Sequence, residues 1–215
     1  MPKIKIRNMP HIKATLKSDY KIIHEDYDTL IVYNKCANAH LAEGYAHTII
    51  NKIKNLKMEC LETTNKEVFD YFYKAGNFKY HQICVQCHHK TSTGISRLYL
   101  PSSQEMQWIA KVQGMSVDEI AQISADNRIF VYKEKGKAVS CIGIHIDGSV
   151  GFLYTRPKYR QRGYAVKAQN ELFKMKKEPI FSQILEDNSA SIALHKKNGW
   201  KFNRYKIYWL FNKGF

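Results

Sequence analysis

A basic turn between a strand and a helix is the feature of this sequence best suited to chemistry. The segment Val150–Ala165 reads VGFLYTRPKYRQRGYA, in which Val150–Thr155 predicts a buried strand and Tyr164 begins a helix. The first backbone N–H groups of a helix have no partner within the helix, and the helix dipole adds partial positive charge there. Gly163 lets a ligand approach this backbone closely. The turn therefore predicts an anion-binding site.

The charges around the turn favour a ligand with more than one negative charge. Four cations lie within seven residues, at Arg156, Lys158, Arg160 and Arg162, and the small Ala165 keeps the helix start uncrowded. A diphosphate fits this arrangement better than a single carboxylate does. The alternative is a solvated basic loop that only begins a helix.

The elements that position this turn follow from apolar spacing and turn residues. The predicted strands are Tyr20–His24, Thr29–Tyr33, Tyr80–His88, Arg97–Leu100, Arg128–Lys133, Ala138–His145, Val150–Thr155, Ile180–Leu185 and Phe202–Phe211, the last as one extended segment or a hairpin. The predicted helices are Ala42–Leu56, Thr64–Gly76, Ser102–Val112, Ser116–Ser124, Tyr164–Lys177 and Ser189–Lys197. This order predicts an α/β or α+β plan around a mixed sheet.

The composition is that of a globular protein with an anionic partner. The 215 residues carry a formal net charge of +15, with the larger basic excess in the second half. The opening residues lack an apolar run of signal-peptide length, and no stretch approaches the roughly 18 to 20 apolar residues of a membrane span. We therefore expect a cytoplasmic protein without a membrane segment, whose five cysteines are free thiols.

The run Cys84-Val85-Gln86-Cys87-His88 has the spacing of a c-type haem attachment site and also suggests zinc. Residues three apart on a strand point to opposite faces, so one metal could not readily take both thiols. No second C-x-x-C or matched histidine pair follows. We therefore predict neither metal nor haem.

The second half of the chain resembles the GCN5-related N-acetyltransferase (GNAT) superfamily. Arg160–Ala165 matches that family's Q/R-x-x-G-x-G/A signature after a central strand. Asn188–Trp200, reading NSASIALHKKNGW, is similar to its N-x-x-S/A-x-x-L-Y-x-x-x-G-F helix. The run Asp147–Gly163, with Pro157 and Tyr159, is similar to the glycine N-acyltransferase-like branch.

The resemblance implies a GNAT fold, with a mixed central sheet flanked by helices. Residues 96–215 would form the catalytic acyltransferase domain. Residues 1–95 would form a smaller half that precedes it, as a degenerate GNAT-like unit.

The implied activity is transfer of an acyl group from acetyl-CoA, or another acyl-CoA, to a primary amine by direct attack in a ternary complex. The acceptor would be a small molecule or an amino acid, with a peptide or protein amine as the weaker choice. The implied cofactor-binding residues are Leu153, Tyr154 and Thr155 along the pantetheine, Arg160, Gln161, Arg162, Gly163, Tyr164 and Ala165 around the pyrophosphate, and Asn188 and Ser191 on the other side of the pantetheine arm.

Two histidines are candidates for proton transfer. The family often has Tyr where this chain has His195, and histidine also protonates a thiolate near neutral pH. Glycine-type enzymes have a Glu where Ser149 stands, which leaves His145 and Asp147 as the nearest possible bases. Each also has a plain structural explanation, since His195 can be a helix residue without a chemical role, His145 a strand end, and Asp147 part of a turn.

A second hypothesis is a GNAT-fold binding module without catalysis, whose basic surface contacts nucleic acid. The missing Glu at position 149 and the histidine at position 195 allow it. Aromatic residues near basic ones, as in Tyr205–Phe211 with Arg204, could stack on single strands, although core packing explains most such clusters.

Overall fold

The computed structural model describes residues 6–212, and contacts divide the chain into two compact units. The first unit contains the residues up to Cys87, together with Gln183–Ile192 and the residues from Lys201 onward. The second unit contains His88–Ser182 and Ala193–Trp200. Each unit is described by itself below.

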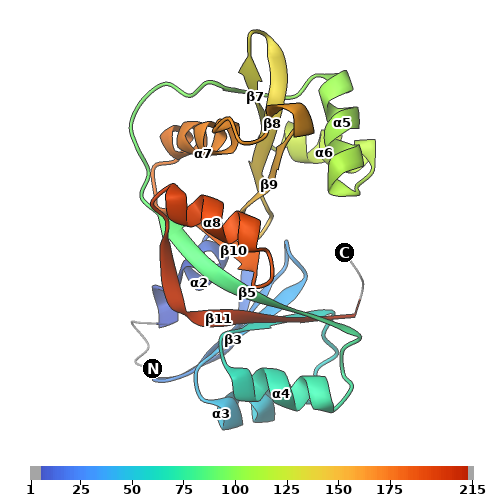
Figure 1. Ribbon diagram of the computed structural model, residues 1–215. Coiled ribbons are helices and arrows are strands. Elements are labelled where there is room, and N and C mark those ends of the chain that lie inside the picture. Colours follow the sequence, from blue (N-terminus) through green and yellow to red (C-terminus); the bar gives the residue numbers. More distant parts are fainter. Residues whose placement is uncertain (1–5, 213–215) are drawn as a thin grey trace. The chain divides into compact units, whose positions relative to one another are not determined.

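Helices and strands are interspersed along the chain (Figure 1). The α-helices are α2 (Pro10–Thr15), α3 (Ala46–Ile53), α4 (Lys66–Lys74), α5 (Ser103–Gln113), α6 (Val117–Ala125), α7 (Tyr164–Met175) and α8 (Ser189–Lys197), with a 3-10 turn η1 (Pro157–Tyr159). The strands are β1 (Tyr20–Glu25), β2 (Leu30–Asn34), β3 (Ala39–Glu43), β4 (Cys60–Thr63), β5 (Tyr80–His89), β6 (Leu98–Tyr99), β7 (Ile129–Glu134), β8 (Lys137–Ile144), β9 (Val150–Thr155), β10 (Ile180–Leu185) and β11 (Lys201–Phe211).

The first unit is built on a mixed sheet with the strand order β1-β2-β3-β4-β11-β5-β10. Strands β3 and β4 pair in parallel, whereas β4 and β11 pair antiparallel. Alternate residues of β2 enter two different cores, because successive side chains of a strand point to opposite faces. Ile31 packs with α3 and α4, while Leu30 and Val32 pack with α2. Figure 1 shows α2 on one face and α3 with α4 on the other.

The second unit is built on the antiparallel sheet β6-β7-β8-β9. Helices α5 and α6 cover one face through a core that includes Ile109, Ile120 and Val131. Helix α7 packs on the other face, against β7, β8 and β9 (Figure 1). The sheet therefore places β9 at its edge, directly before the turn that leads into α7.

Several predicted elements are confirmed together with the reasons given for them. Strand β10 and helix α8 have the predicted bounds. Helices α5 and α6 begin with capping boxes, in which Ser102 pairs with Glu105 and Ser116 with Glu119. The predicted α/β plan with a mixed sheet is also confirmed.

Other predictions were wrong in the first unit. The expected helix Ala42–Leu56 begins only at Ala46, because the preceding residues form the fully buried strand β3. Strand β4 and helix α2 were not predicted at all. Both are short, and β4 contains the polar residues Glu62 and Thr63, so neither produces an apolar repeat. Within residues 6–212, no helix is both long and apolar enough to cross a membrane.

Candidate acyl-CoA site

A bulge interrupts the edge strand β9 halfway along its length. Between the pairs Cys141↔Tyr154 and Gly143↔Gly151, β8 supplies one residue and β9 supplies two, one of which is Phe152 with a φ of 53°. The Phe152 carbonyl accepts hydrogen bonds from Gln113 Nε2 at 3.2 Å and from Cys141 Sγ at 3.1 Å. Burial raises the pKa of the Cys141 thiol to about 12, so the S–H is retained as a donor.

The bulge and the edge position leave backbone groups of β9 available to a ligand. Leu153, Tyr154 and Thr155, predicted to line the pantetheine, follow Phe152 and are half-buried. Among the described strands, β8 is the only neighbour of β9 in its sheet. An extended chain could therefore pair with the outer edge of β9 by backbone hydrogen bonds.

The predicted phosphate turn begins helix α7 in the expected way. Gly163 is the N-cap residue and has a left-handed backbone, with a φ of 78°. The first hydrogen bond of the helix runs from Lys167 N–H to the Gly163 carbonyl. The N–H groups of Tyr164 and Ala165 therefore point out of the helix start, next to the positive end of its dipole. A left-handed residue followed by a helical one is a nest, a backbone concavity that accepts anions.

The space in front of Gly163 is open. A Cβ atom placed on Gly163 would meet no heavy atom within 4 Å. Gln161 also has a positive φ, of 59°, and both Gln161 and Arg162 are exposed. The residues of the turn thus combine outward N–H groups with room for a ligand, as a diphosphate requires.

Two of the four cations of the turn are each held by both an aromatic ring and a backbone carbonyl of the second unit. The guanidinium carbon of Arg156 lies 3.9 Å from the centre of the Trp108 ring on α5, and Arg156 Nε donates to the Ala138 carbonyl at 2.9 Å. Arg160 lies over the Tyr154 ring at 5.2 Å and donates from Nε to the Thr155 carbonyl at 3.2 Å. These contacts order the charges before any ligand binds.

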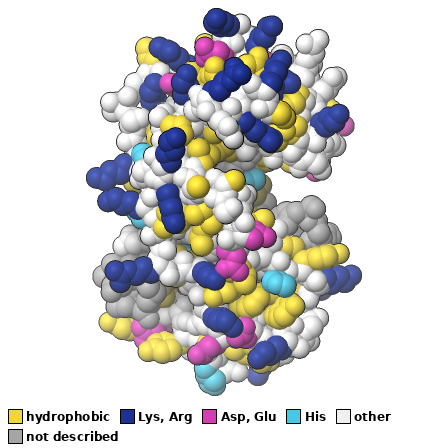
Figure 2. All heavy atoms as spheres, viewed as in Figure 1, with side chains coloured by type: hydrophobic (Ala, Val, Ile, Leu, Met, Phe, Trp, Pro, Cys, Tyr) yellow, Lys and Arg dark blue, Asp and Glu magenta, His cyan; other side chains and the backbone are white. Residues whose placement is uncertain are grey.

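The other two cations of the turn are exposed. Lys158 lies 5.2 Å from the centre of the Tyr159 ring, and Arg162 extends from the turn itself. In the face drawn in Figure 2, Lys and Arg side chains clearly outnumber acidic ones in the upper part of the view. The surroundings of the turn are thus electropositive, as an anionic ligand requires.

Asn188 and Ser191, predicted to face the pantetheine, lie in the first unit at the start of α8. Asn188 Oδ1 accepts a hydrogen bond from the Ser191 N–H at 3.0 Å. This contact is that of a helix N-cap, which satisfies one of the unpaired N–H groups of α8.

His195, the proposed acid, is a buried residue of the second unit. Only 3% of its surface is exposed, and its ring lies 4.7 Å from that of Trp200. Its Nε2 atom lies 3.1 Å from the Gln169 side-chain nitrogen on α7. The ring is therefore fixed in orientation by Gln169 on α7 and by Trp200.

His145, the proposed base, lies directly after β8 and packs against β9. Its ring centre is 4.2 Å from that of Phe152, the bulge residue, and a Cβ atom on Gly151 would overlap its Nε2 atom. Removal of the ring from water lowers the pKa of His145, and the nearby Asp147 carboxylate partly opposes this effect. The neutral ring is therefore favoured near pH 7. Asp147 Oδ1 is engaged by the N–H and hydroxyl of Ser149, at 2.9 and 2.7 Å.

Sequence reasoning missed three residues that shape this site. Gln169 and Trp108 both lie on helices, but the residues that they contact come from distant segments of the chain. The spacing of residues in the sequence therefore did not indicate a role for either. Gly151 could have been found, because a glycine inside a strand often marks a close approach of another group. The bulge at Phe152 arises from the register between β9 and β8, and no sequence motif indicates it.

The residues described contain no cluster suited to a metal ion. Among residues 6–212, no group of three or more His, Cys, Asp or Glu side chains is arranged to hold one. Cys84 and Cys87 are both buried on β5.

Comparisons with known proteins assign the second half of the chain. Residues 95–200 match the model of the acetyltransferase (GNAT) family. The family as a whole supports acyl-CoA-dependent N-acetyl transfer, and it does not favour the alternative of a nucleic-acid-binding module.

Solved structures show that the fold likeness extends over nearly the whole chain. A GCN5-related N-acetyltransferase from Kribbella flavida has a TM-score of 0.56 and 10% identity, and the match covers 100% of this chain and 97% of that one. An acetyltransferase of the GNAT family from Colwellia psychrerythraea has a TM-score of 0.52 and 10% identity, covering 93% and 87%. A Drosophila protein has a TM-score of 0.64 and 9% identity, covering 97% and 84%. At these identities the likeness concerns the fold alone. A search of curated proteins finds no match.

Proposed function

We propose that this protein is an acyl-CoA-dependent N-acyltransferase of the EC 2.3.1 type. It transfers an acyl group, acetyl in the first instance, to the primary amine of a small molecule or an amino acid. This acceptor follows the resemblance of Asp147–Gly163 to the glycine N-acyltransferase-like branch. The division into residues 1–95 and a catalytic part 96–215, and a cytoplasmic location, are part of the same proposal.

The observation that carries the proposal is the open, left-handed Gly163 at the start of α7. It combines outward N–H groups, the positive end of a helix and exposed cations within one turn. The pyrophosphate of coenzyme A has the charge and size for the turn Arg160–Ala165. A single carboxylate would neutralise less of this positive charge than a diphosphate does.

The donor would be oriented by backbone groups on β9. The pantetheine would pair with the edge at Leu153, Tyr154 and Thr155, and Asn188 and Ser191 are also proposed to bind it. An N–H group at the Phe152 bulge, where pairing with β8 is interrupted, would stabilise the oxyanion that develops on the thioester carbonyl. Holding both substrates in one complex would supply much of the rate.

The reaction itself needs one base and one group that assists the thiolate. The amine nitrogen attacks the thioester carbon, the new C–N bond forms, and the C–S bond breaks. His145 is the proposed base that takes the proton lost by the amine, since its lowered pKa keeps the ring neutral. His195 is proposed to assist the departing thiolate by a hydrogen bond or a proton from its ring.

Calorimetric titration with acetyl-CoA at two salt concentrations tests the proposal. Binding that weakens as salt rises is expected, because the phosphates meet an electropositive turn. Release of free thiol is then followed with a panel of small amines and amino acids. Absence of binding to acetyl-CoA and to longer acyl-CoA esters would refute the proposal.

A further inference from the structure

Gln169 on α7 is completely buried, and its side-chain oxygen faces two donors. Trp200 Nε1 lies 3.3 Å from Oε1, and Asn198 Nδ2 lies 2.7 Å from it. An indole nitrogen can only donate a hydrogen bond. The atom of Gln169 that faces Trp200 must therefore be the oxygen, which fixes the orientation of the amide.

The nitrogen of the same amide then faces His195. Gln169 Nε2 lies 3.1 Å from His195 Nε2, and an amide NH2 group has no lone pair with which to accept. The hydrogen bond therefore runs from Gln169 to His195, and His195 Nε2 carries no hydrogen. A neutral imidazole has one N–H, which must be at Nδ1.

We propose that Gln169 is a positioning residue that holds His195 as a neutral ring with its hydrogen on Nδ1. A proton on Nε2 would place two donors face to face, so Gln169 also opposes the charged ring. The consequence for catalysis rests on the proposed function. A neutral His195 carries no excess proton for the departing thiolate, so solvent supplies the proton of the thiol product.

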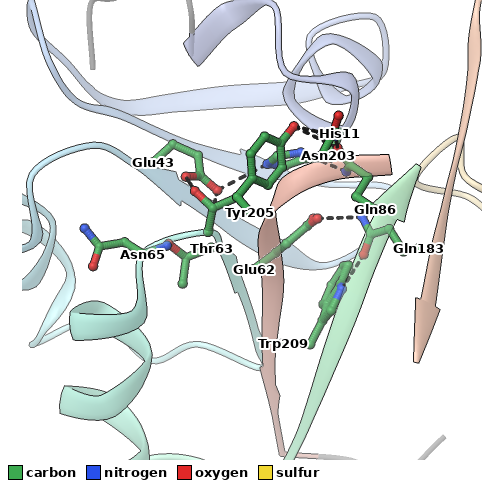
Figure 3. A network of polar contacts seen from close by, with 11 residues as sticks. His11, Glu43, Glu62, Thr63, Asn65, Gln86, Gln183, Asn203, Tyr205 and Trp209 are labelled. Carbon is green, nitrogen blue, oxygen red and sulfur yellow. Dashed lines mark hydrogen bonds and ion pairs between the residues drawn. The ribbon is translucent and has the colours of Figure 1, made fainter. Parts of the chain in front are cut away.

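A second buried histidine provides an internal comparison (Figure 3). Gln86 Oε1 accepts from Asn203 Nδ2 at 2.8 Å and from the Tyr205 hydroxyl at 3.0 Å, which turns Gln86 Nε2 toward His11 Nδ1 at 3.1 Å. His11 Nε2 lies 3.2 Å from a carboxylate oxygen of Glu43. The same reasoning thus places the His11 hydrogen on Nε2, the opposite tautomer.

The test is an NMR spectrum of the full chain labelled with 15N at histidine, recorded near neutral pH without coenzyme A. The His195 and His11 signals are assigned by their loss in His195→Asn and His11→Asn variants. For His195, Nδ1 is expected to carry the hydrogen and Nε2 to lack one, whereas His11 shows the reverse. A hydrogen on Nε2 of His195, alone or together with one on Nδ1, would overturn the proposal.

A Gln169→Glu variant tests the role of the amide directly. One carboxylate oxygen still accepts from Asn198 and Trp200, whereas the other faces His195 as an acceptor. The His195 hydrogen is then expected to move to Nε2, or the ring to take up a second proton. Asn170→Asp, one residue along on the exposed face of α7, adds the same charge and is expected to leave His195 unchanged. An unchanged His195 spectrum in Gln169→Glu would refute control by Gln169. The spectra need no substrate, so a lack of acyl transfer would refute only the proposed function.

Discussion

The guanidinium of Arg156 stacks on the ring of Trp108, with 3.9 Å between the guanidinium carbon and the ring centre. The stack joins helix α5 to the segment that follows β9. It also implies that Arg156 stabilises the folded structure, whereas the exposed Arg162 is available to a ligand.

A double-mutant cycle with Trp108→Leu and Arg156→Met should therefore show a coupling of about 1 kcal/mol in the free energy of unfolding. Urea denaturation of the four proteins measures it. The matching cycle with Arg162→Met in place of Arg156→Met should show a coupling near zero. Equal couplings in both cycles would contradict the assignment of the stack.

Gly163→Glu should weaken acetyl-CoA binding at least about tenfold, since a carboxylate beside the phosphates costs more than about 1.4 kcal/mol. Calorimetry measures the affinity. Gly76→Glu is the matched control, because Gly76 also has a positive φ, of 68°, and open surroundings, but lies in the first unit after α4. Normal affinity in Gly163→Glu would exclude this turn as the phosphate site.

The pH dependence of stability should report on His145. Burial lowers its folded-state pKa below 6.5, so the unfolded chain binds a proton at higher pH than the folded protein does. The contribution of His145 is complete above pH 6.5 and is lost as the pH falls toward the folded value. The drop in unfolding free energy between pH 7.5 and pH 5.5 should therefore be smaller in His145→Gln.

Urea denaturation at the two pH values measures this drop. His47→Gln, at an exposed position on α3, should retain the wild-type drop. His40, whose pKa is also lowered by burial, is present in every variant and cancels in the comparison. Identical drops in His145→Gln and wild type would show that the ring is not desolvated.

Gly151→Ala should destabilise the protein by about 1–3 kcal/mol, because the added methyl group overlaps the His145 ring. Removing the ring should relieve the overlap, so a His145→Ala, Gly151→Ala double variant should be more stable than the sum of the two single effects implies. Thermal or urea denaturation of all four proteins checks this. Simple additivity would mean that His145 does not lie over Gly151.

Much of the second half of the chain could be predicted from the sequence because its signals are local. Strand β10 is an apolar run that begins after a proline, and α8 lies between Asn188 and an asparagine-glycine pair. The phosphate turn could be predicted equally well, because the glycine, the arginines and the helix start are adjacent in the chain.

The remaining features depend on partners that are distant in sequence. Glu62 on β4 lies outside every predicted helix and strand, although it is buried and accepts a hydrogen bond at 2.7 Å from Gln183 Nε2, 121 positions away in the chain. Gln169 was likewise not singled out by the sequence. Its burial is explained by contacts with His195 on α8 and with Asn198 and Trp200, which follow α8.

The last strand, β11, pairs with β4 and lies between β4 and β5 in the sheet of the first unit. Leu210 of this strand also belongs to the core beneath α3 and α4. On the ribosome, the N-terminal segment thus emerges with a gap in its sheet that only residues Lys201–Phe211 can fill. Folding of this unit must wait until Lys201–Phe211 has been synthesised, and the exposed edges of β4 and β5 must until then be kept from pairing with other chains.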